Sequence, residues 1–522
     1  MARIRNAFPL RMELALLLAV GSSACNSLTK LDAYTVGSDT GSDEAAACVS
    51  NARCTEEAST AAGQNVAAVC VRSSGRCVNL LSEDCDVITG DPSSDDTIVI
   101  GSLFSTKGAQ AATNIQRQQS AMLAVSQIND VGGVPGPEGK PRKLVLVSCD
   151  ESTDLMRVGD HLVGELRVPA IVGPNTSQDT LDLSTSVSVP GGTVVMSPTA
   201  VASSVGALLD DDLTWLMVPT DVQRAPLMIH QINELETKLK TERAVQNVKL
   251  GIVFRNDALG IGTRTSLNAL MLNGKALSDS VNLGNNVHIN PYEFTAADQT
   301  AIVDEYLAFL PDIVVLAGTA EAITRVLIPL EAAWPAGRAR PHYVLIDSVK
   351  VPELITAATE DADLRLRVRG TGIRPSPASA AVYDAFKVDY EIAYPGSSII
   401  SGMGPAYDAT YAIALALAAK KDRPLSGEAV AEGLRMLGGG NTEIQIGATR
   451  VLSAFQRLAA GESIHALGTF SSLAWTGDGT VLGGTLEMWC IGAPSGRPAY
   501  QGSGLTFDIM TQTLSGQFTQ CN

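Results

Sequence analysis

The stretch VPAIVGPNTSQDTLDLS, residues 168–184, contains the three parts of a strand–loop–helix unit. The apolar run 168–172 predicts a short buried strand, and Gly173-Pro174 ends it. Four small polar residues follow at 175–178, and helical spacing begins at Leu181. The stretch therefore predicts one βα unit with a polar loop at the carboxyl end of its strand.

The same alternation extends in both directions along the chain. Short apolar strands that alternate with amphipathic helices are typical of βαβ units and a parallel sheet. The pattern runs from residue 97 to about 220 and restarts after residue 222, which predicts an α/β fold with two Rossmann-like lobes. Strands are predicted at 97–104, 143–149, 168–172, 193–198, 248–254, 280–283, 312–318 and 342–347, and helices at 114–129, 225–239, 261–272, 297–309, 320–333, 379–393, 406–420 and 447–460.

Length, charge and composition exclude several classes of function. A chain of 522 residues exceeds one ordinary domain. The net charge of −17 disfavours nucleic acid as a partner. The five histidines are scattered, and the sequence has no P-loop, zinc-type spacing, G-x-S-x-G motif or catalytic Cys/His pair. We expect no metal, no cofactor and no enzymatic activity.

The first 24 residues have the pattern of a signal peptide. Three arginines precede the apolar run LALLLAV at 14–20, which is too short to span a membrane. The following GSSAC resembles a bacterial lipobox, which would make Cys25 the lipidated N-terminus. Ser22 stands where a lipobox has leucine, so ordinary signal cleavage before Cys25 is the alternative. Either way, the mature chain is expected in an oxidising compartment.

The cysteines predict disulfides near both ends of the mature chain. Residues 25–47 have the composition of a flexible linker, and 48–90 form a small Cys-rich module that lacks the residues for a core. Its connectivity is open, although the fifth cysteine, Cys85, could reach Cys149. The β-rich tail carries Cys490 and Cys521, which are expected to pair. Lipidation of Cys25 would leave eight cysteines to form disulfides.

A ligand site is expected where the strands end. Open parallel sheets bind ligands at the carboxyl ends of their strands. Four loops there are small and polar, at 102–108, 173–179, 197–204 and 346–350. The helix that begins near Ser177 offers free N–H groups and a partial positive charge, which suit a carboxylate. The alternative is that Thr176 or Ser177 only caps the helix.

Six phrases of the sequence occur in a characteristic order: INDVGGVPG (128–136), AIVGPNTS (170–177), VMSPTA (195–200), VKLGIVFRNDALGIG (248–262), PDIVVLAG (311–318) and GPAYDATYAIALALA (404–418). Together they resemble the type I periplasmic binding proteins, in the branch that binds leucine, isoleucine and valine, and the resemblance covers about 97–490. It implies two α/β lobes joined by three crossing strands, with lobe 1 at 97–220 and 376–465, lobe 2 at 221–375, and the last crossing with the end of lobe 2 at 466–522.

The resemblance implies roles for residues in the loops. Ser177, beside Thr176, matches the serine that binds the ligand's α-carboxylate. Asp347 matches the acid that holds the α-ammonium, with an end-of-strand cap as its alternative. In the family, a second loop contacts the ligand through backbone atoms and a threonine hydroxyl. Its counterpart here is Thr199, Ala200 and Val201, and Val201 stands at the position of that threonine. Leu259, Thr319 and, approximately, Thr113 occupy aromatic wall positions of the family.

The implied function is extracytoplasmic capture of a small polar ligand, an amino acid or a related carboxylate, for an ABC-type permease. The alternative is a ligand-sensing or surface-interaction lipoprotein with the same fold and no transport role. The expected partners are the ligand, a permease or a membrane sensor, and the membrane through the lipid anchor. The protein is expected to be a monomer that faces the periplasm or the cell surface.

Overall fold

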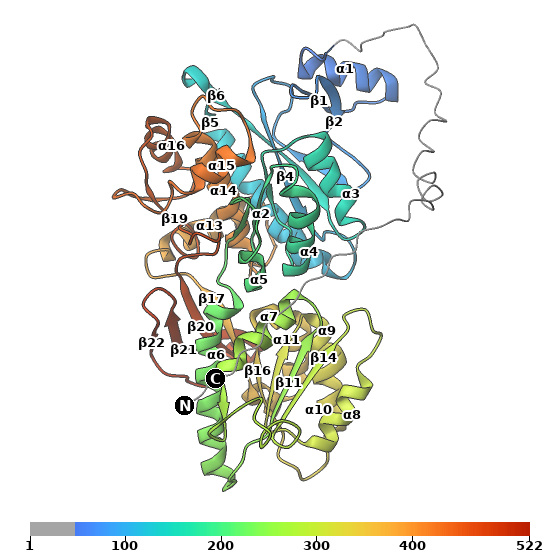
Figure 1. The fold of residues 1–522 in the computed structure, drawn as a ribbon, viewed down its shortest axis with the longest axis vertical. Helices are drawn as coiled ribbons and strands as arrows, with labels where there is room; N and C mark the ends of the chain where they lie inside the picture. The colour runs from blue at the N-terminus through green and yellow to red at the C-terminus, as the bar shows by residue number, and fades with distance from the viewer. Residues whose placement is uncertain (1–46, 522) are drawn as a thin grey trace, which may run out of the picture. The chain divides into compact units, whose positions relative to one another are not determined.

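The computed structural model describes residues 47–521, so the predicted signal peptide, the predicted lipidation site at Cys25 and nearly all of the predicted linker lie outside the described residues. The described chain contains two large sheets with helices on their faces (Figure 1). We call the halves built on them the first and the second lobe. The predicted class, α/β with two Rossmann-like lobes, is confirmed.

The first lobe has six strands in the order β10-β9-β8-β4-β7-β3, all parallel except β3. The strands are β3 (Cys85–Thr89), β4 (Ile98–Phe104), β7 (Leu144–Asp150), β8 (Ala170–Val172), β9 (Val194–Ser197) and β10 (Thr214–Leu216). Its helices are α2 (Ala111–Asp130), α3 (Leu155–Gly159), α4 (Ser177–Leu183) and α5 (Ser203–Gly206), and β5 (Val134–Pro135) pairs with β6 (Pro141–Arg142).

A later part of the chain completes the first lobe. The Ala-rich helix α14 packs against α2 inside the largest core cluster, and all 17 of its residues are buried. Its tyrosines Tyr407 and Tyr411 both donate a hydrogen bond to Oε1 of Gln127 on α2. This part comprises α13 (Ala380–Ala393), α14 (Met403–Ala419), α15 (Gly427–Leu434), β18 (Glu443–Gln445), α16 (Val451–Ala460) and β19 (His465–Leu467).

The second lobe has eight strands in the order β14-β11-β15-β16-β17-β20-β21-β22. The strands β14 to β17 are parallel, and the last three are antiparallel. They are β11 (Leu250–Arg255), β14 (Val287–Tyr292), β15 (Ile313–Ala317), β16 (His342–Leu345), β17 (Val368–Arg374), β20 (Thr485–Gly492), β21 (Ala499–Asp508) and β22 (Thr513–Ser515). The helices are α6 (Asp221–Arg243), α7 (Ala258–Ser266), α8 (Thr300–Phe309), α9 (Ala320–Ala322), α10 (Ile328–Ala333), α11 (Pro352–Glu360) and α12 (Ala362–Arg367).

The chain passes between the lobes three times, as predicted. The passages follow β10, follow β17 and precede β20. They are hydrogen-bonded to their surroundings: Trp475 Nε1 donates to the Leu216 carbonyl at 2.8 Å, and Gln223 Nε2 donates to the Val481 carbonyl at 2.9 Å.

The cysteine segment is attached to the first lobe. Disulfides Cys48–Cys70 and Cys54–Cys77 hold α1 (Asn51–Ala62) against the hairpin of β1 (Ala68–Val71) and β2 (Arg76–Asn79). Strand β3 then pairs with β7 at the sheet edge. The expected bonds Cys85–Cys149 and Cys490–Cys521 are both confirmed, so all eight described cysteines are paired.

One predicted strand is wrong. Residues 280–282 form turns, Leu283 makes only an isolated bridge to Val287, and the strand of this region is β14. The physical reason is Asn282, whose buried side-chain amide donates to the carbonyls of Leu272, Lys275 and Ala276. These bonds fold the segment onto the hairpin of β12 (Met271–Leu272) and β13 (Lys275–Ala276). That hairpin also contradicts the predicted helix 261–272, because α7 ends at Ser266.

The loop after β8 depends on a glycine. Gly173 has φ +110°, and a Cβ there would lie 2.1 Å from the carbonyl oxygen of Leu103. Only glycine permits this approach. The strand of the opening stretch therefore ends against β4, and its polar loop lies over the carboxyl edge of the sheet.

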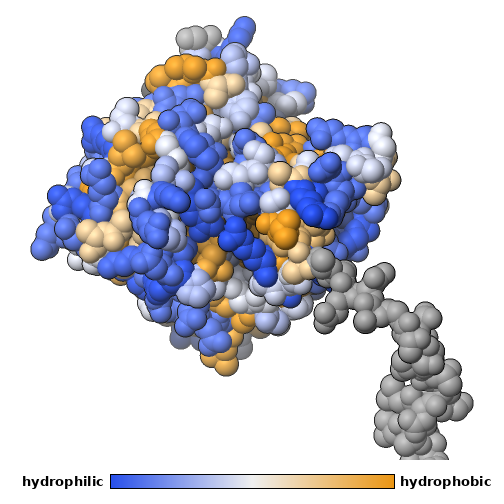
Figure 2. All heavy atoms as spheres, turned by 90° about the horizontal axis from the view of Figure 1, so that it is seen from above, coloured by the Kyte–Doolittle hydropathy of each residue, from blue (hydrophilic) through white to orange (hydrophobic). Residues whose placement is uncertain are grey.

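No helix among residues 47–521 is both long enough and apolar enough to cross a bilayer. On the face seen in Figure 2, the hydrophobic residues form small groups separated by hydrophilic ones.

Candidate functional site

Polar side chains from four loops of the first lobe meet at the carboxyl edge of its sheet. The Thr199 hydroxyl, after β9, lies 2.5 Å from the Asn175 carbonyl and 2.6 Å from Asn175 Oδ1, after β8. The Asn175 backbone N–H bonds to Glu151, which follows β7. The Ser105 hydroxyl, after β4, donates to Glu151 Oε1 at 3.1 Å. We use the name junction cluster for Ser105, Arg117, Glu151, Asn175, Thr199, Asp347 and Ser401.

Glu151 has an unusual environment. The residue is only 6% exposed, and its buried Oε2 has no hydrogen-bond partner among the described residues. Burial, and after it the nearby Asp179 carboxylate, raise the pKa of the carboxyl to about 8, against the Ser105 and Asn175 hydrogen bonds. At neutral pH, Glu151 is therefore mostly protonated.

Arg117 on α2 joins the cluster from the other side. Its Nε donates to the Ser401 carbonyl at 2.9 Å, and its Nη1 donates to Asn114 Oδ1 at 2.9 Å. Burial lowers the pKa of Arg117 to about 10, while the charges of Asp347 and Glu151 oppose that shift. A Cβ on Gly402 would lie 2.6 Å from Arg117 Nε and 2.6 Å from Thr199 Cγ2. A glycine at 402, where φ is +89°, thus allows Arg117 and Thr199 to converge.

Asp347 is the residue that the second lobe contributes to the junction cluster. It follows β16, and its Oδ2 accepts a hydrogen bond from the Ser401 hydroxyl of the first lobe at 3.2 Å. The Arg224 guanidinium lies on the other side, with Nη1 3.8 Å from the same oxygen. Burial lowers the pKa of Arg224, and Asp347 partly offsets this effect. The cluster therefore contains groups from both lobes.

Ser177 and Thr176, the residues predicted to bind a carboxylate, lie beside the cluster and accept hydrogen bonds from neighbouring backbone N–H groups. Ser177 is 2% exposed, and its Oγ accepts hydrogen bonds from the backbone N–H groups of Val201 at 3.0 Å and Ala202 at 3.1 Å. Thr176 caps α4 by accepting from the Asp179 N–H at 3.1 Å. The Val201 and Ala202 N–H groups thus already have Ser177 as their acceptor, and the Ala200 N–H donates to the Ser197 hydroxyl.

The other predicted residues are in varied surroundings. Ala200 is fully buried, and Val201 packs against the second lobe's core. Leu259 belongs to that same core. The backbone N–H of Thr319 donates to Glu321 Oε1 at 2.9 Å, and its hydroxyl bonds to the same carboxylate. Thr113 is a half-buried residue in the first turn of α2. The structure thus brings Thr199 and Asp347 into the cluster, and it places Leu259 and Thr319 elsewhere.

Sequence reasoning did not select Arg117, Glu151, Asn175, Ser401 or Arg224. Glu151 and Asn175 had a usable signal, since each follows a predicted strand at its carboxyl end. Arg117, Ser401 and Arg224 had no such signal in the sequence. Arg117 and Ser401 are 284 positions apart, and only the packing of α14 on α2 places them together.

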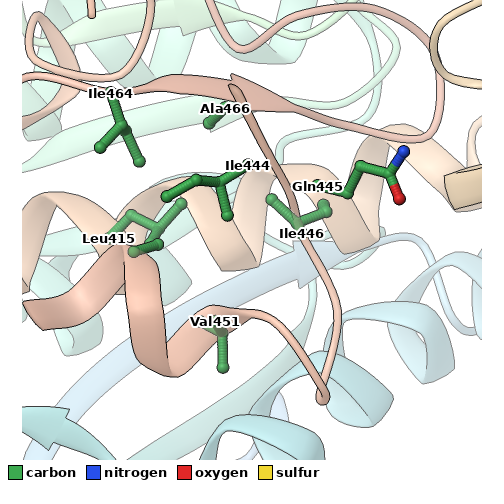
Figure 3. Close-up of a pocket in the computed structure, with 8 residues that line it drawn as sticks. Leu415, Ile444, Gln445, Ile446, Val451, Ile464 and Ala466 are labelled. Carbon is green, nitrogen blue, oxygen red and sulfur yellow. The ribbon is translucent and has the colours of Figure 1, made fainter. Parts of the chain in front are cut away.

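A gap in the first lobe is lined by apolar side chains, with Gln445 as the one polar residue among them (Figure 3). It lies between α14, α16 and the pair β18–β19, and no part of it is wide enough for a water molecule. Its lining is Leu415, Ile444, Gln445, Ile446, Val451, Ala454, Ile464 and Ala466, which makes it a packing defect of the core.

Comparison with solved structures identifies the fold. The chain is similar to the branched-chain amino acid transporter substrate-binding protein LivJ of Streptococcus pneumoniae in complex with isoleucine, with a TM-score of 0.55 and 19% identity over 78% of this chain and 99% of that one. It is similar to an ABC transporter substrate-binding protein of Desulfitobacterium hafniense in complex with leucine, with a TM-score of 0.52 and 18% identity over 78% and 100%. It is also similar to a type 1 periplasmic binding protein of Bordetella pertussis, with a TM-score of 0.54 and 17% identity over 78% and 100%.

These likenesses establish the fold of the type I periplasmic binding proteins, as the sequence resemblance predicted. The solved structures named are binding proteins rather than enzymes. No protein-family model and no curated protein matches the sequence.

Proposed function

We propose that this protein captures a small polar ligand, an amino acid or a related carboxylate, between its lobes and delivers it to an ABC-type permease outside the cytoplasm. The observation that carries the proposal is the junction cluster. It gathers charged and hydroxyl groups from the carboxyl edges of both sheets, where open α/β folds bind ligands. The fold supports it, because proteins of this fold are two lobes that close around a ligand by hinge bending.

The chemistry of the cluster suits binding. Enclosed hydrogen bonds and charge pairs supply affinity and orientation in a site that excludes water. The predicted contacts are Ser177 with Thr176, the loop of Thr199, Ala200 and Val201, the acid Asp347, and the wall residues Leu259 and Thr319. No covalent step and no cofactor form part of the proposal.

A thermal-shift screen of amino acids, carboxylates and amides tests the proposal. A ligand at a hundred times its Kd stabilises the native state by about 2.7 kcal/mol, which raises the melting temperature by several degrees. The double variant Ser177→Ala, Asp347→Ala should lose that shift. A screen in which no compound stabilises the wild type contradicts the proposed function, and turnover of a bound compound contradicts a purely binding role.

The alternative role is ligand sensing or surface interaction without transport. It is favoured by the cysteine segment, which is fixed to the edge of the first sheet by Cys85–Cys149 and extends the fold on that side. Reconstitution with a candidate permease separates the two roles, since ligand-dependent uptake supports transport. Membrane attachment is tested by Cys25→Ser, which should move the protein to the soluble fraction; retention in the membrane contradicts a lipid anchor.

A further inference from the structure

We infer that Glu151 and Arg117 are the recognition pair for the ligand, with Glu151 binding its ammonium group and Arg117 its carboxylate. The inference rests on the proposed function and deepens it, because it selects zwitterionic amino acids over simple carboxylates. It assigns both charged contacts to residues of the first lobe, while Ser177 holds the neighbouring loop in place and Asp347 joins the two lobes.

The unpartnered oxygen of Glu151 is the first support. Buried side-chain oxygens normally have hydrogen-bond partners, and leaving one without a partner is costly. Glu151 Oε1 accepts a hydrogen bond from the Ser105 hydroxyl, which orients the carboxyl, while Oε2 has no partner among the described residues. An ammonium group on a ligand would supply the missing donor and a compensating charge.

The second support is that the Asp347 carboxylate already has partners. This carboxylate already accepts the Ser401 hydroxyl and faces the Arg224 guanidinium. An ammonium placed there would have to approach two arginines, since Arg117 also feels the Asp347 charge. The contacts of Asp347 instead join the first lobe to the second, which suits a residue that favours lobe closure.

Arg117 offers a group for the other end of the ligand. Its Nε and Nη1 have acceptors, and no acceptor for Nη2 is found in residues 47–521. Its neighbour Thr199 bonds to Asn175, which in turn bonds to Glu151. A ligand that carries both charged groups would therefore be bound along one edge of the sheet.

Binding of an ammonium by Glu151 has a proton balance. The carboxyl is mostly protonated at neutral pH, so it must ionise when the ammonium binds, and its proton goes to the solvent. The charged groups that face it are Asp179 on α4, Asp150 on β7 and Arg117 on α2. Both acids oppose ionisation of Glu151, and an incoming cation counteracts them.

Titration calorimetry of the wild type tests the inference with three matched probes: an amino acid found in the screen, its amine without the carboxylate, and its acid without the ammonium. We expect the amino acid to bind at least tenfold more tightly than either fragment. At pH 7, measurements in two buffers of different ionisation enthalpy should reveal release of nearly one proton per amino acid bound. Absence of proton release, or equal binding of the acid fragment, overturns the inference while leaving the proposed function in place.

Variants provide a second readout. Glu151→Gln should weaken amino-acid binding about ten- to hundredfold and abolish proton release, because the neutral amide forms no ion pair with an ammonium and has no proton to release. Arg117→Gln should lower the preference for the amino acid over its amine. The exposed Glu428→Gln is the matched control and should change neither quantity. Unchanged affinity in a folded Glu151→Gln protein overturns the inference, whereas failure of every probe on the wild type overturns the proposed function itself.

Discussion

Replacement of Asp408 by asparagine should change how the stability of this protein depends on pH. Asp408 lies on α14, is 2% exposed, and accepts hydrogen bonds from the Thr469 N–H at 2.8 Å and the Thr469 hydroxyl at 2.9 Å. Burial raises the pKa of its carboxyl to about 7, although the Thr469 and Phe470 donors oppose the shift. Asparagine keeps an acceptor for the Thr469 N–H and removes the titration.

The sign and size of the effect follow from linkage. Between pH 4 and 7 the native state holds a proton on Asp408 that the unfolded chain has lost, so each pH unit in that interval lowers the free energy of unfolding by about 1.4 kcal/mol. Above pH 7 both states are ionised and the loss is complete. From pH 5 to 8, the stability of the wild type relative to Asp408→Asn should therefore fall by about 3 kcal/mol.

Urea unfolding at pH 5, 6, 7 and 8 measures this difference. Other buried acids, Glu151 among them, titrate in both proteins, so their contributions cancel when the variant is compared with the wild type. Asp304→Asn on α8, which makes the same substitution at an exposed position, is the control. A difference for Asp408→Asn that stays constant across the same range would refute the reasoning.

Three further predictions concern stability. Arg157→Leu removes the two donors, at 2.7 and 2.8 Å, that hold the buried Asp84 carboxylate, and should lower the urea midpoint; an unchanged urea midpoint would contradict this. Replacing Cys85 and Cys149 together by alanine frees the edge strand and should lower the free energy of unfolding by about 2 to 5 kcal/mol; equal melting temperatures would argue against a stabilising bond. Burial lowers the pKa of His342 to about 3, so below about pH 6.5 the unfolded chain binds a proton that the native state does not, and the free energy of unfolding falls as the pH drops. His342→Gln should therefore retain more of its neutral-pH stability at pH 5; parallel plots of stability against pH for the two proteins would exclude the effect.

The alternation of strands and helices was readable from the sequence because it depends on local patterns. A buried parallel strand needs a short apolar run, and glycine, proline and small polar residues mark its end. The failure at residues 280–283 has a long-range cause. Their short apolar alternation resembles a strand, but the Asn282 amide bonds to three carbonyls of a neighbouring hairpin, and no local pattern carries that information.

The candidate site also has features that local sequence patterns predict and features that depend on long-range contacts. The sequence indicated the loops, since each follows a strand, and it located Thr199 and Asp347 in them. It could not indicate that Asp347 meets Ser401, because that contact joins different lobes. Nor could it indicate that Ser177 accepts from the backbone of Val201 and Ala202, which depends on how closely two loops approach.

The sequence by itself thus determined the two-lobed α/β fold and the edges where polar loops gather, because hydrophobic periodicity and turn residues act over a few positions. Only the tertiary structure decided which of those polar groups are already bonded and which are not. Ser177 has its partners, whereas Glu151 keeps a buried oxygen without one. Burial and hydrogen-bond satisfaction are properties of the packed chain, so the loop that opened the sequence is best understood together with its neighbours Glu151 and Arg117.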